Sequence, residues 1–371
     1  MKLNELESFT SDKLNQLTKD LNALHYTNDG DRLTWGFSPA IEINAWAESF
    51  TTRDQPAYHS VTLTQQLVIS IHRDIEDYLC YLESHQDDAL FCRVFDGVDH
   101  LSSMLNGFTR EQCFKNIYLA AIVWIYYHEL GHLSQEHGLI RKKYVSENTS
   151  KIAECFAHSR EPLTGKAAAI FHTTEIAADF YSVVCCCRDL TQADSPEIVP
   201  VILHHLFCGI TLAIHRFHGD QGFIPQQVPE GKHPKPLVRL ELMYPLVAEV
   251  LSSGLYESRH PDFDKKNILE ITSQSAFTVA LFWLKKKSLA DQRNADYFLQ
   301  SILFKPGVID YLKIIIDTWD EIEDEILSLK RFGDFPFILT FSDQLRERAG
   351  CRINKKKQLS DSDDGENDTD Q

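Results

Sequence analysis

An unbroken run of apolar and aromatic residues, 117–127 (IYLAAIVWIYY), leads directly into residues 128–132, which read HELGH. The run is too short to cross a bilayer, which takes roughly 18–20 apolar residues. Ahead of it, Thr109 and Gln112 have the spacing of a capping box, with a hydroxyl at the N-cap and an amide at N3. Helical periodicity continues to about His137. The sequence therefore predicts a strongly apolar helix with a polar cluster near its C-terminal end.

Length and charge narrow the class of protein. At 371 residues the chain fits one large or two small domains. Its apolar fraction of 43% and charged fraction of 25% are typical of a globular protein. The net charge is −17, and residues 360–371 hold six acidic residues and no basic one. Because phosphate would be repelled, we expect no nucleic-acid partner.

Cysteine usage and the N-terminus favour a reducing compartment. Three of the nine cysteines, residues 185–187, are consecutive and cannot form a regular disulfide framework. We interpret the cysteines as small apolar packing residues. The first 17 residues alternate in charge and do not resemble a signal peptide. The apolar run 199–214 contains two histidines, so we expect a cytoplasmic protein without membrane insertion.

The periodicity of the chain predicts a mainly α fold with a small antiparallel β-sheet in the N-terminal third, an α+β class. Strands are expected at 40–47 and 59–63, and a loop at 219–236. Helices are expected near 1–25, 64–84, 109–137, 166–188, 197–218, 237–252, 266–287 and 308–330. The expected units are an N-terminal helical segment (1–39), a central domain (40–252), a C-terminal helical region packed on it (253–350) and a disordered acidic tail (351–371).

The polar cluster after the apolar run has the spacing of a zinc site. His128 and His132 are four residues apart, so on a helix both imidazoles lie on one face and can bind one metal ion. Glu129 would stand beside the water held by that ion and act as general base. Chance alone gives such a five-residue pattern in about 5% of chains of this length, so the context must support it. Gly131 leaves room for a second helix to approach closely.

A second pair of residues supplies that context. Glu175 and Asp179 are also four residues apart, on a predicted helix with small neighbours. Glu175 could be the third zinc ligand, and Asp179 could accept a hydrogen bond from a ligating histidine. The alternative is a solvated helix face, but the apolar residues around the pair favour burial.

With these residues the sequence resembles a gluzincin metallopeptidase with a zincin-like fold. Residues 41–47 (IEINAWA) and 60–67 (SVTLTQQL) are similar to the strand pair of the CAAX prenyl protease family and its soluble relatives, in which Asn44 and Ala45 would bind substrate along an edge strand. Residues 233–239 (HPKPLVR) resemble the segment beyond the active site in that family, so His233 would stabilise the oxyanion and Arg239 would orient the outer shell.

The resemblance covers about residues 40–250. The sequence also resembles, more narrowly, the Lit-type phage-exclusion peptidases. It departs from the pattern of the CAAX prenyl protease family in three respects. No membrane helices flank the motif, the gap between His132 and Glu175 has no assigned role, and the last 120 residues resemble no family.

The remaining histidines have plainer interpretations. His172 could face the site and would be the next candidate for a third ligand, but we expect it to be exposed. His137, five residues after His132, falls off the metal-binding face of a continuous helix and is excluded as a ligand. Four more are expected to be core or surface residues: His204, His205, His215 and His218.

Together these features predict a zinc metalloendopeptidase acting on a cytoplasmic protein or peptide, with one zinc ion per chain. The alternative is a scaffold or regulatory protein that binds zinc without turnover. The presence of Glu129 favours the enzyme, because a purely structural zinc site needs no base and normally has four protein ligands.

Overall fold

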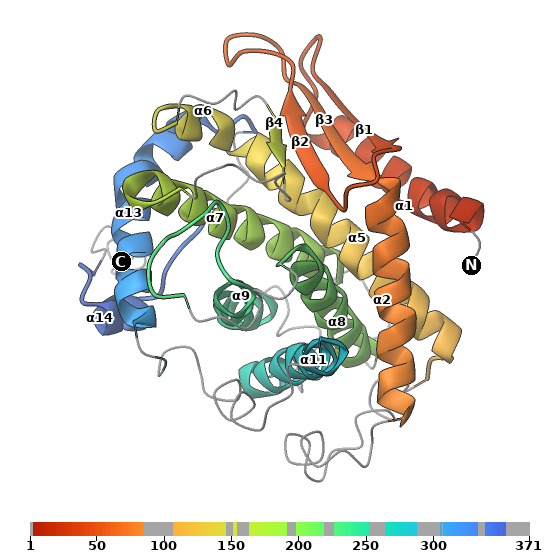
Figure 1. Ribbon diagram of the computed structural model, residues 1–371. Helices are drawn as coiled ribbons and strands as arrows, with labels where there is room; N and C mark the ends of the chain where they lie inside the picture. The colour runs from red at the N-terminus through yellow and green to blue at the C-terminus, as the bar shows by residue number, and fades with distance from the viewer. Residues whose placement is uncertain are drawn as a thin grey trace, which may run out of the picture.

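The computed structural model describes residues 3–84, 107–145, 151–153, 163–190, 198–218, 226–252, 264–287, 305, 307–332 and 338–353. Within them the chain is mainly helical, with one small sheet at the side of the helices (Figure 1). The α+β class predicted from the sequence is therefore confirmed. The tail from residue 354 onward lies outside the described residues, so its predicted disorder stays a prediction.

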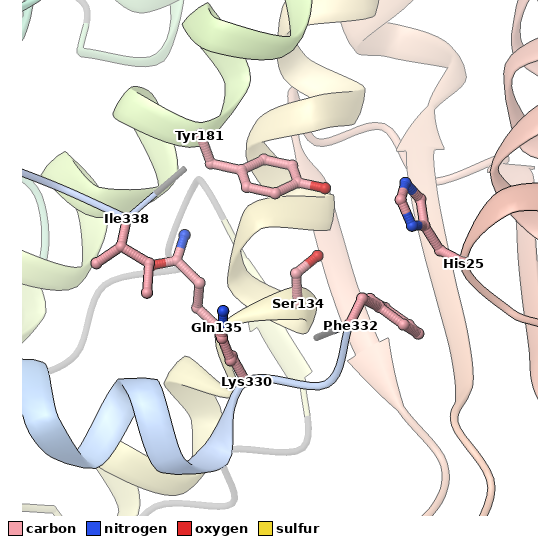
Figure 2. Close-up of a pocket in the computed structure, with 7 residues that line it drawn as sticks. All are labelled: His25, Ser134, Gln135, Tyr181, Lys330, Phe332 and Ile338. Carbon is pink, nitrogen blue, oxygen red and sulfur yellow. The ribbon is translucent and has the colours of Figure 1, made fainter. Parts of the chain in front are cut away.

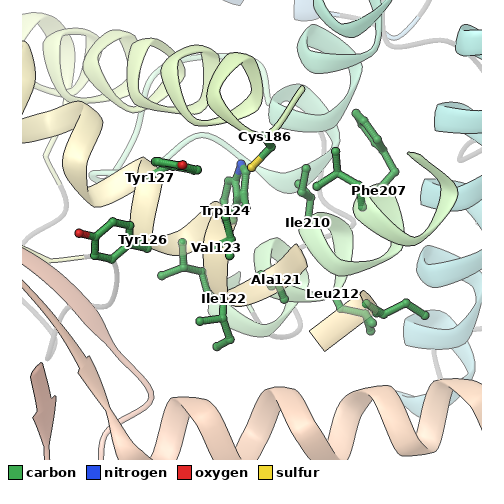
Figure 3. Close-up of a cluster of buried hydrophobic side chains, with 14 of the residues drawn as sticks. Ala121, Ile122, Val123, Trp124, Tyr126, Tyr127, Cys186, Phe207, Ile210 and Leu212 are labelled. Atoms are coloured by element: carbon green, nitrogen blue, oxygen red, sulfur yellow. The ribbon is translucent and has the colours of Figure 1, made fainter. Parts of the chain in front are cut away.

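Helix α5 (Arg110–Ser134) runs through the centre of the molecule. It begins at the predicted capping box: the Thr109 side chain accepts from the backbone of Gln112, and the Gln112 side chain accepts from the backbone of Thr109. Helices with apolar residues around their whole circumference are buried, and α5 is buried on all sides from Val123 to Ser134. Figure 3 shows its apolar residues packed against α7 and α8.

Helices α7 (Gly165–Leu190) and α8 (Val199–His218) pack directly on α5. Glycines permit this proximity. A Cβ added at Gly131 would lie 3.2 Å from the Cα of Ala178 in α7. One added at Gly209 in α8 would lie 2.5 Å from the carbonyl oxygen of Ile117. The room expected at Gly131 from the sequence is thus filled by α7.

In the described part of the chain, five other long helices surround α5, α7 and α8. Their bounds agree with the predicted segments to within a few residues. They are α1 (Leu3–Leu24), α2 (Gln65–Ser84), α9 (Pro236–Leu251), α11 (Lys265–Lys286) and α13 (Val308–Leu329). Helix α8 is long and apolar enough to span a membrane, but 83% of its most apolar window is buried in the fold. Its apolar surface is used in packing.

The sheet has the strand order β1 (Arg32–Ser38), β3 (Tyr58–Thr64), β2 (Ala45–Ser49) and β4 (Lys151–Ala153). The predicted antiparallel sheet is wrong in one respect: β1 runs parallel to β3, so the sheet is mixed. Strand β1 was not predicted, and the strand expected at 40–47 begins only at Ala45. Within the segment 1–39, which was expected to be helical, residues 32–38 form β1 and join the sheet.

Two short helices were also not predicted. Helix α5 ends at Ser134 rather than near His137, because Glu136 adopts a left-handed conformation with φ 51°. Helix α6 (His137–Lys142) then starts in a new direction. Near the C-terminus, α14 (Asp343–Ala349) packs on α13, which itself packs on α7.

The segment after α13 is fastened to the end of α5. The backbone N–H of Arg331 donates to the carbonyl of Ser134 at 3.0 Å. The Arg331 guanidinium pairs with Glu136 and donates to the carbonyls of Thr52 and Gln55, both at 3.0 Å. One arginine thus ties the C-terminal region, the end of α5 and the turn between β2 and β3 together.

Candidate metal centre

Helices α5 and α7 bring three potential metal ligands together. The Nε2 atoms of His128 and His132 lie 3.1 Å apart. One oxygen of Glu175 lies 3.3 Å from Nε2 of His128, and the other lies 3.3 Å from Nε2 of His132. In tetrahedral zinc sites with bonds of about 2.0–2.1 Å, neighbouring ligand atoms are about 3.3–3.4 Å apart. The three donors therefore stand close to the spacing that one zinc ion requires.

The centre is enclosed, and His132 and Glu175 are in the states that a metal requires. Side-chain exposure is only 0–1% for the three donors. Burial lowers the pKa of His132 to about 4, so its imidazole is neutral at pH 7. Burial alone would raise the pKa of Glu175, but His233, His132 and Arg141 hold it well below the usual value, so Glu175 is ionised. Neutral imidazoles and a carboxylate are what a zinc ion binds.

Behind His128 lies a chain of outer partners. Its Nδ1 atom is 2.9 Å from a carboxylate oxygen of Asp179, which leaves Nε2 toward the other donors. Arg239 of α9 donates to both oxygens of Asp179, at 2.7 and 2.8 Å. The Arg239 guanidinium also stacks on the ring of Trp124, which contacts the His128 ring. Asp179 and Arg239 thus lie where the sequence led us to expect them.

Helix α6 supplies two partners that sequence reasoning missed. The Nδ1 atoms of His137 and His132 are 2.8 Å apart. The Arg141 guanidinium donates to Glu175 at 2.6 Å. His137 was excluded as a ligand on the assumption of a continuous helix, and the structure places it against His132 instead. In the sequence, His137 and Arg141 do repeat the four-residue spacing of His128 and His132. That spacing groups the two residues with each other but does not place them beside the three donors.

Two further predicted residues lie at the centre. Glu129 is fully buried on α5, on the same turn that carries His128 and His132. Nε2 of His233 is 3.7 Å from Glu175, and with 12% exposure it is the most exposed of the side chains that contact this carboxylate. The loop before α9 therefore delivers His233 to the side of the centre that solvent can reach.

His172 is buried, which corrects the expectation that it is exposed. Its Nδ1 lies 3.0 Å from the hydroxyl of Tyr311, and its Nε2 lies 3.2 Å from the carbonyl of Glu230. Burial lowers the pKa of His172 to about 3. A histidine with both nitrogens in such contacts is a structural link between α7, α13 and the loop that carries His233. The other core histidines include His204 and His215, both buried in α8.

The structure does not have the exposed edge strand that was expected to bind substrate around Asn44. Strand β2 is not an edge strand, because residues 46–48 pair with β4 in antiparallel orientation. Asn44 and Ala45 precede this paired stretch and are buried. The backbone of Asn44 is joined to Thr64 by two hydrogen bonds, of 3.0 and 3.1 Å.

A separate pocket lies beside the C-terminal end of α5 (Figure 2). It is lined by His25, Ser134, Gln135, Tyr181, Lys330, Phe332 and Ile338. None of the three donors lines it, so the pocket and the metal centre are different sites. It marks the place where α5, α7 and the segment after α13 meet.

Comparisons with protein families, with curated proteins and with solved structures found no match for this chain. The centre is therefore interpreted from its own geometry.

Proposed function

We propose that the protein is a zinc metalloendopeptidase with a zincin-like arrangement around α5. The observation that carries this proposal is a set of three donors at zinc spacing, with Glu129 outside the set but buried on the same stretch of α5 that carries both histidines. Among the described residues no fourth His, Cys, Asp or Glu joins the set. Three protein ligands with an open fourth position are typical of catalytic zinc sites, whereas structural sites usually have four.

A bound zinc ion would supply a water of lowered pKa and a Lewis acid for the substrate carbonyl. Glu129 would accept a proton from the attacking water and deliver it to the departing amine. His233 would donate a hydrogen bond to the oxygen that becomes negative. Asp179 and Arg239 would keep His128 oriented throughout.

A peptide substrate would bind as an added strand. Since β4 covers residues 46–48, and Asn44 and Ala45 are buried, strand addition would fall on the outer side of β4. The expected substrate is a cytoplasmic protein, as the composition and the resemblance to Lit-type peptidases suggest.

The second candidate is a protein that binds zinc without turnover, and the burial of the centre favours it. The donors are at most 1% exposed, so a substrate cannot reach them without some rearrangement. Glu129 distinguishes the two candidates, because only the enzyme needs a carboxylate there that can exchange a proton.

The deciding variant is Glu129→Gln, which keeps the volume of the side chain but removes the base. Zinc content, measured by mass spectrometry of the purified protein, should stay at one ion per chain. Turnover should fall by roughly 10²–10⁴-fold, measured as new protein N-termini in lysate incubated with wild type or variant.

Glu111→Gln on the same helix is the matched control, because Glu111 is exposed and pairs with Lys115 one turn along, at the far end of α5 from the donors. It should leave both zinc content and turnover unchanged. New N-termini that appear equally with Glu129→Gln and wild type, with zinc bound in both, would contradict the peptidase.

A further inference from the structure

Each of the three donors is held by a different outer partner. Asp179 lies against His128, His137 against His132, and Arg141 against Glu175. The pairing of Arg141 with Glu175 differs from the other two, because it places a positively charged side chain next to a centre that is proposed to bind a metal cation.

Arg141 is fixed in place from three directions. One nitrogen of its guanidinium donates to Oε1 of Glu175 at 2.6 Å, and Nε donates to the hydroxyl of Thr174 at 2.8 Å. The guanidinium also lies over the ring of Phe171, 4.5 Å from its centre. The arginine is only 2% exposed, so it has little freedom to leave Glu175.

Arg141 helps to keep Glu175 ionised, but its charge also acts against a bound cation, so neither affinity for metal nor stability of the fold is enough to explain this placement. A positive charge close to a bound zinc ion repels it and weakens binding. A buried ion pair is also, in general, no more stabilising than well-packed apolar side chains of the same volume. What the guanidinium does is direct: it donates to Oε1 of Glu175, the oxygen 3.3 Å from His132, and leaves Oε2, 3.3 Å from His128, without a hydrogen bond among the described residues.

We propose that Arg141 is a positioning residue that restricts Glu175 to one-oxygen coordination of the metal through Oε2. This inference rests on the proposed function, since it assumes that the centre binds zinc. With both oxygens bound, Glu175 would raise the coordination number from four to five before substrate arrives. By holding Oε1, Arg141 would keep the fifth coordination position open for the substrate carbonyl.

Cobalt(II) tests the coordination directly, because four-coordinate cobalt absorbs visible light much more strongly than five-coordinate cobalt. Wild-type protein loaded with Co²⁺ should show the intense four-coordinate spectrum. Arg141→Met keeps an unbranched apolar stem and removes the donors, so its cobalt form should lose most of this absorbance. Thr174→Val, which frees Nε of Arg141, should show a smaller loss.

Zinc affinity separates this role from a merely structural one. Loss of an ordinary outer partner weakens metal binding by roughly 10–100-fold. Arg141→Met should weaken zinc binding less than that, because Glu175 gains a second ligand oxygen and a repelling charge is removed.

The outcomes are distinct. If wild type binds neither Zn²⁺ nor Co²⁺, the proposed function fails and this inference fails with it. If wild type binds metal but the absorbance is unchanged in Arg141→Met and Thr174→Val, only the role of Arg141 is overturned. If Arg141→Met does not fold, an unchanged spectrum in Thr174→Val overturns the role by itself.

Discussion

At the scale of single residues, spacing along a helix was enough to find the three candidate donors and Asp179, but not His137 or Arg141. His128, His132, Glu175 and Asp179 were predictable because four-residue spacing places side chains on one helix face. His137 was not, because five residues along a continuous helix point well away from His132. The left-handed Glu136 breaks the helix and turns His137 back toward its neighbour. A single non-glycine residue with positive φ cannot be foreseen from periodicity.

The assignment of Glu175 as third ligand can be tested against His172, three residues earlier. Glu175→Gln keeps an oxygen that can accept from Arg141, but an amide is a poor zinc ligand. Zinc affinity should fall by more than roughly 100-fold, beyond the usual effect of an outer partner. His172→Gln is the control and should keep one zinc per chain, measured by titration against a chromophoric chelator. The reverse result would make His172 the ligand.

At the scale of elements, helices were more predictable than strands. Capping residues and apolar spacing are local signals, so the ends of α2, α7 and α13 lie within two residues of the predicted ones. Strand order depends on pairing between distant segments. Nothing in residues 32–38 indicated that β1 would join β3 in parallel, or that residues 151–153 would cover β2.

Substitution of the two glycines at helix contacts should have different effects: Gly209 should affect stability, and Gly131 should affect zinc affinity. Gly209→Ala would press a methyl group on the backbone of α5, at 2.5 Å from the carbonyl oxygen of Ile117. We expect a loss of about 1–3 kcal/mol in the free energy of unfolding, measured by urea denaturation with chelator present. The zinc affinity of the folded protein should not change.

Gly131→Ala meets α7 at 3.2 Å, a contact that a small shift relieves. Alanine also favours the helix by about 1 kcal/mol over glycine, so stability should change little. The shift moves α7, and Glu175 with it, so zinc affinity should fall. A loss of stability without any loss of affinity would show that α7 does not set the position of the ligand.

At the scale of the whole molecule, the fold joins regions that sequence reasoning had separated. The last 120 residues resembled no family, yet α13 packs on α7, and Tyr311 contacts His172 beside the centre. Such contacts join residues more than 100 positions apart, and no local pattern predicts them. The core likewise includes residues from α1 to α11.

A buried histidine outside the candidate metal centre is expected to make the stability of this core depend on pH. His215 of α8 is fully buried against Trp283, and burial lowers its pKa to about 3, below the ordinary 6.5. Between pH 3 and 6.5, therefore, His215 binds a proton in the unfolded chain but stays neutral in the folded chain. His215 contributes stability above pH 6.5 that is lost as the pH falls toward 3.

Between pH 7 and pH 5 this residue should remove on the order of 2 kcal/mol from the free energy of unfolding. His215→Phe keeps a ring against Trp283 and cannot titrate, so its stability should fall less over the same range. Urea denaturation of both proteins at pH 7, 6 and 5, with chelator present, measures the difference. Parallel curves would show that His215 does not carry this dependence.

The burial of α5 also has a consequence for synthesis. The helix ends at Ser134, but the two helices that cover it, α7 and α8, end only at His218. At about 5–20 residues per second, a ribosome needs roughly 4–16 s to make the intervening chain. During that interval an apolar helix has emerged without its cover. The nascent chain therefore exposes apolar surface of α5 that the finished protein buries.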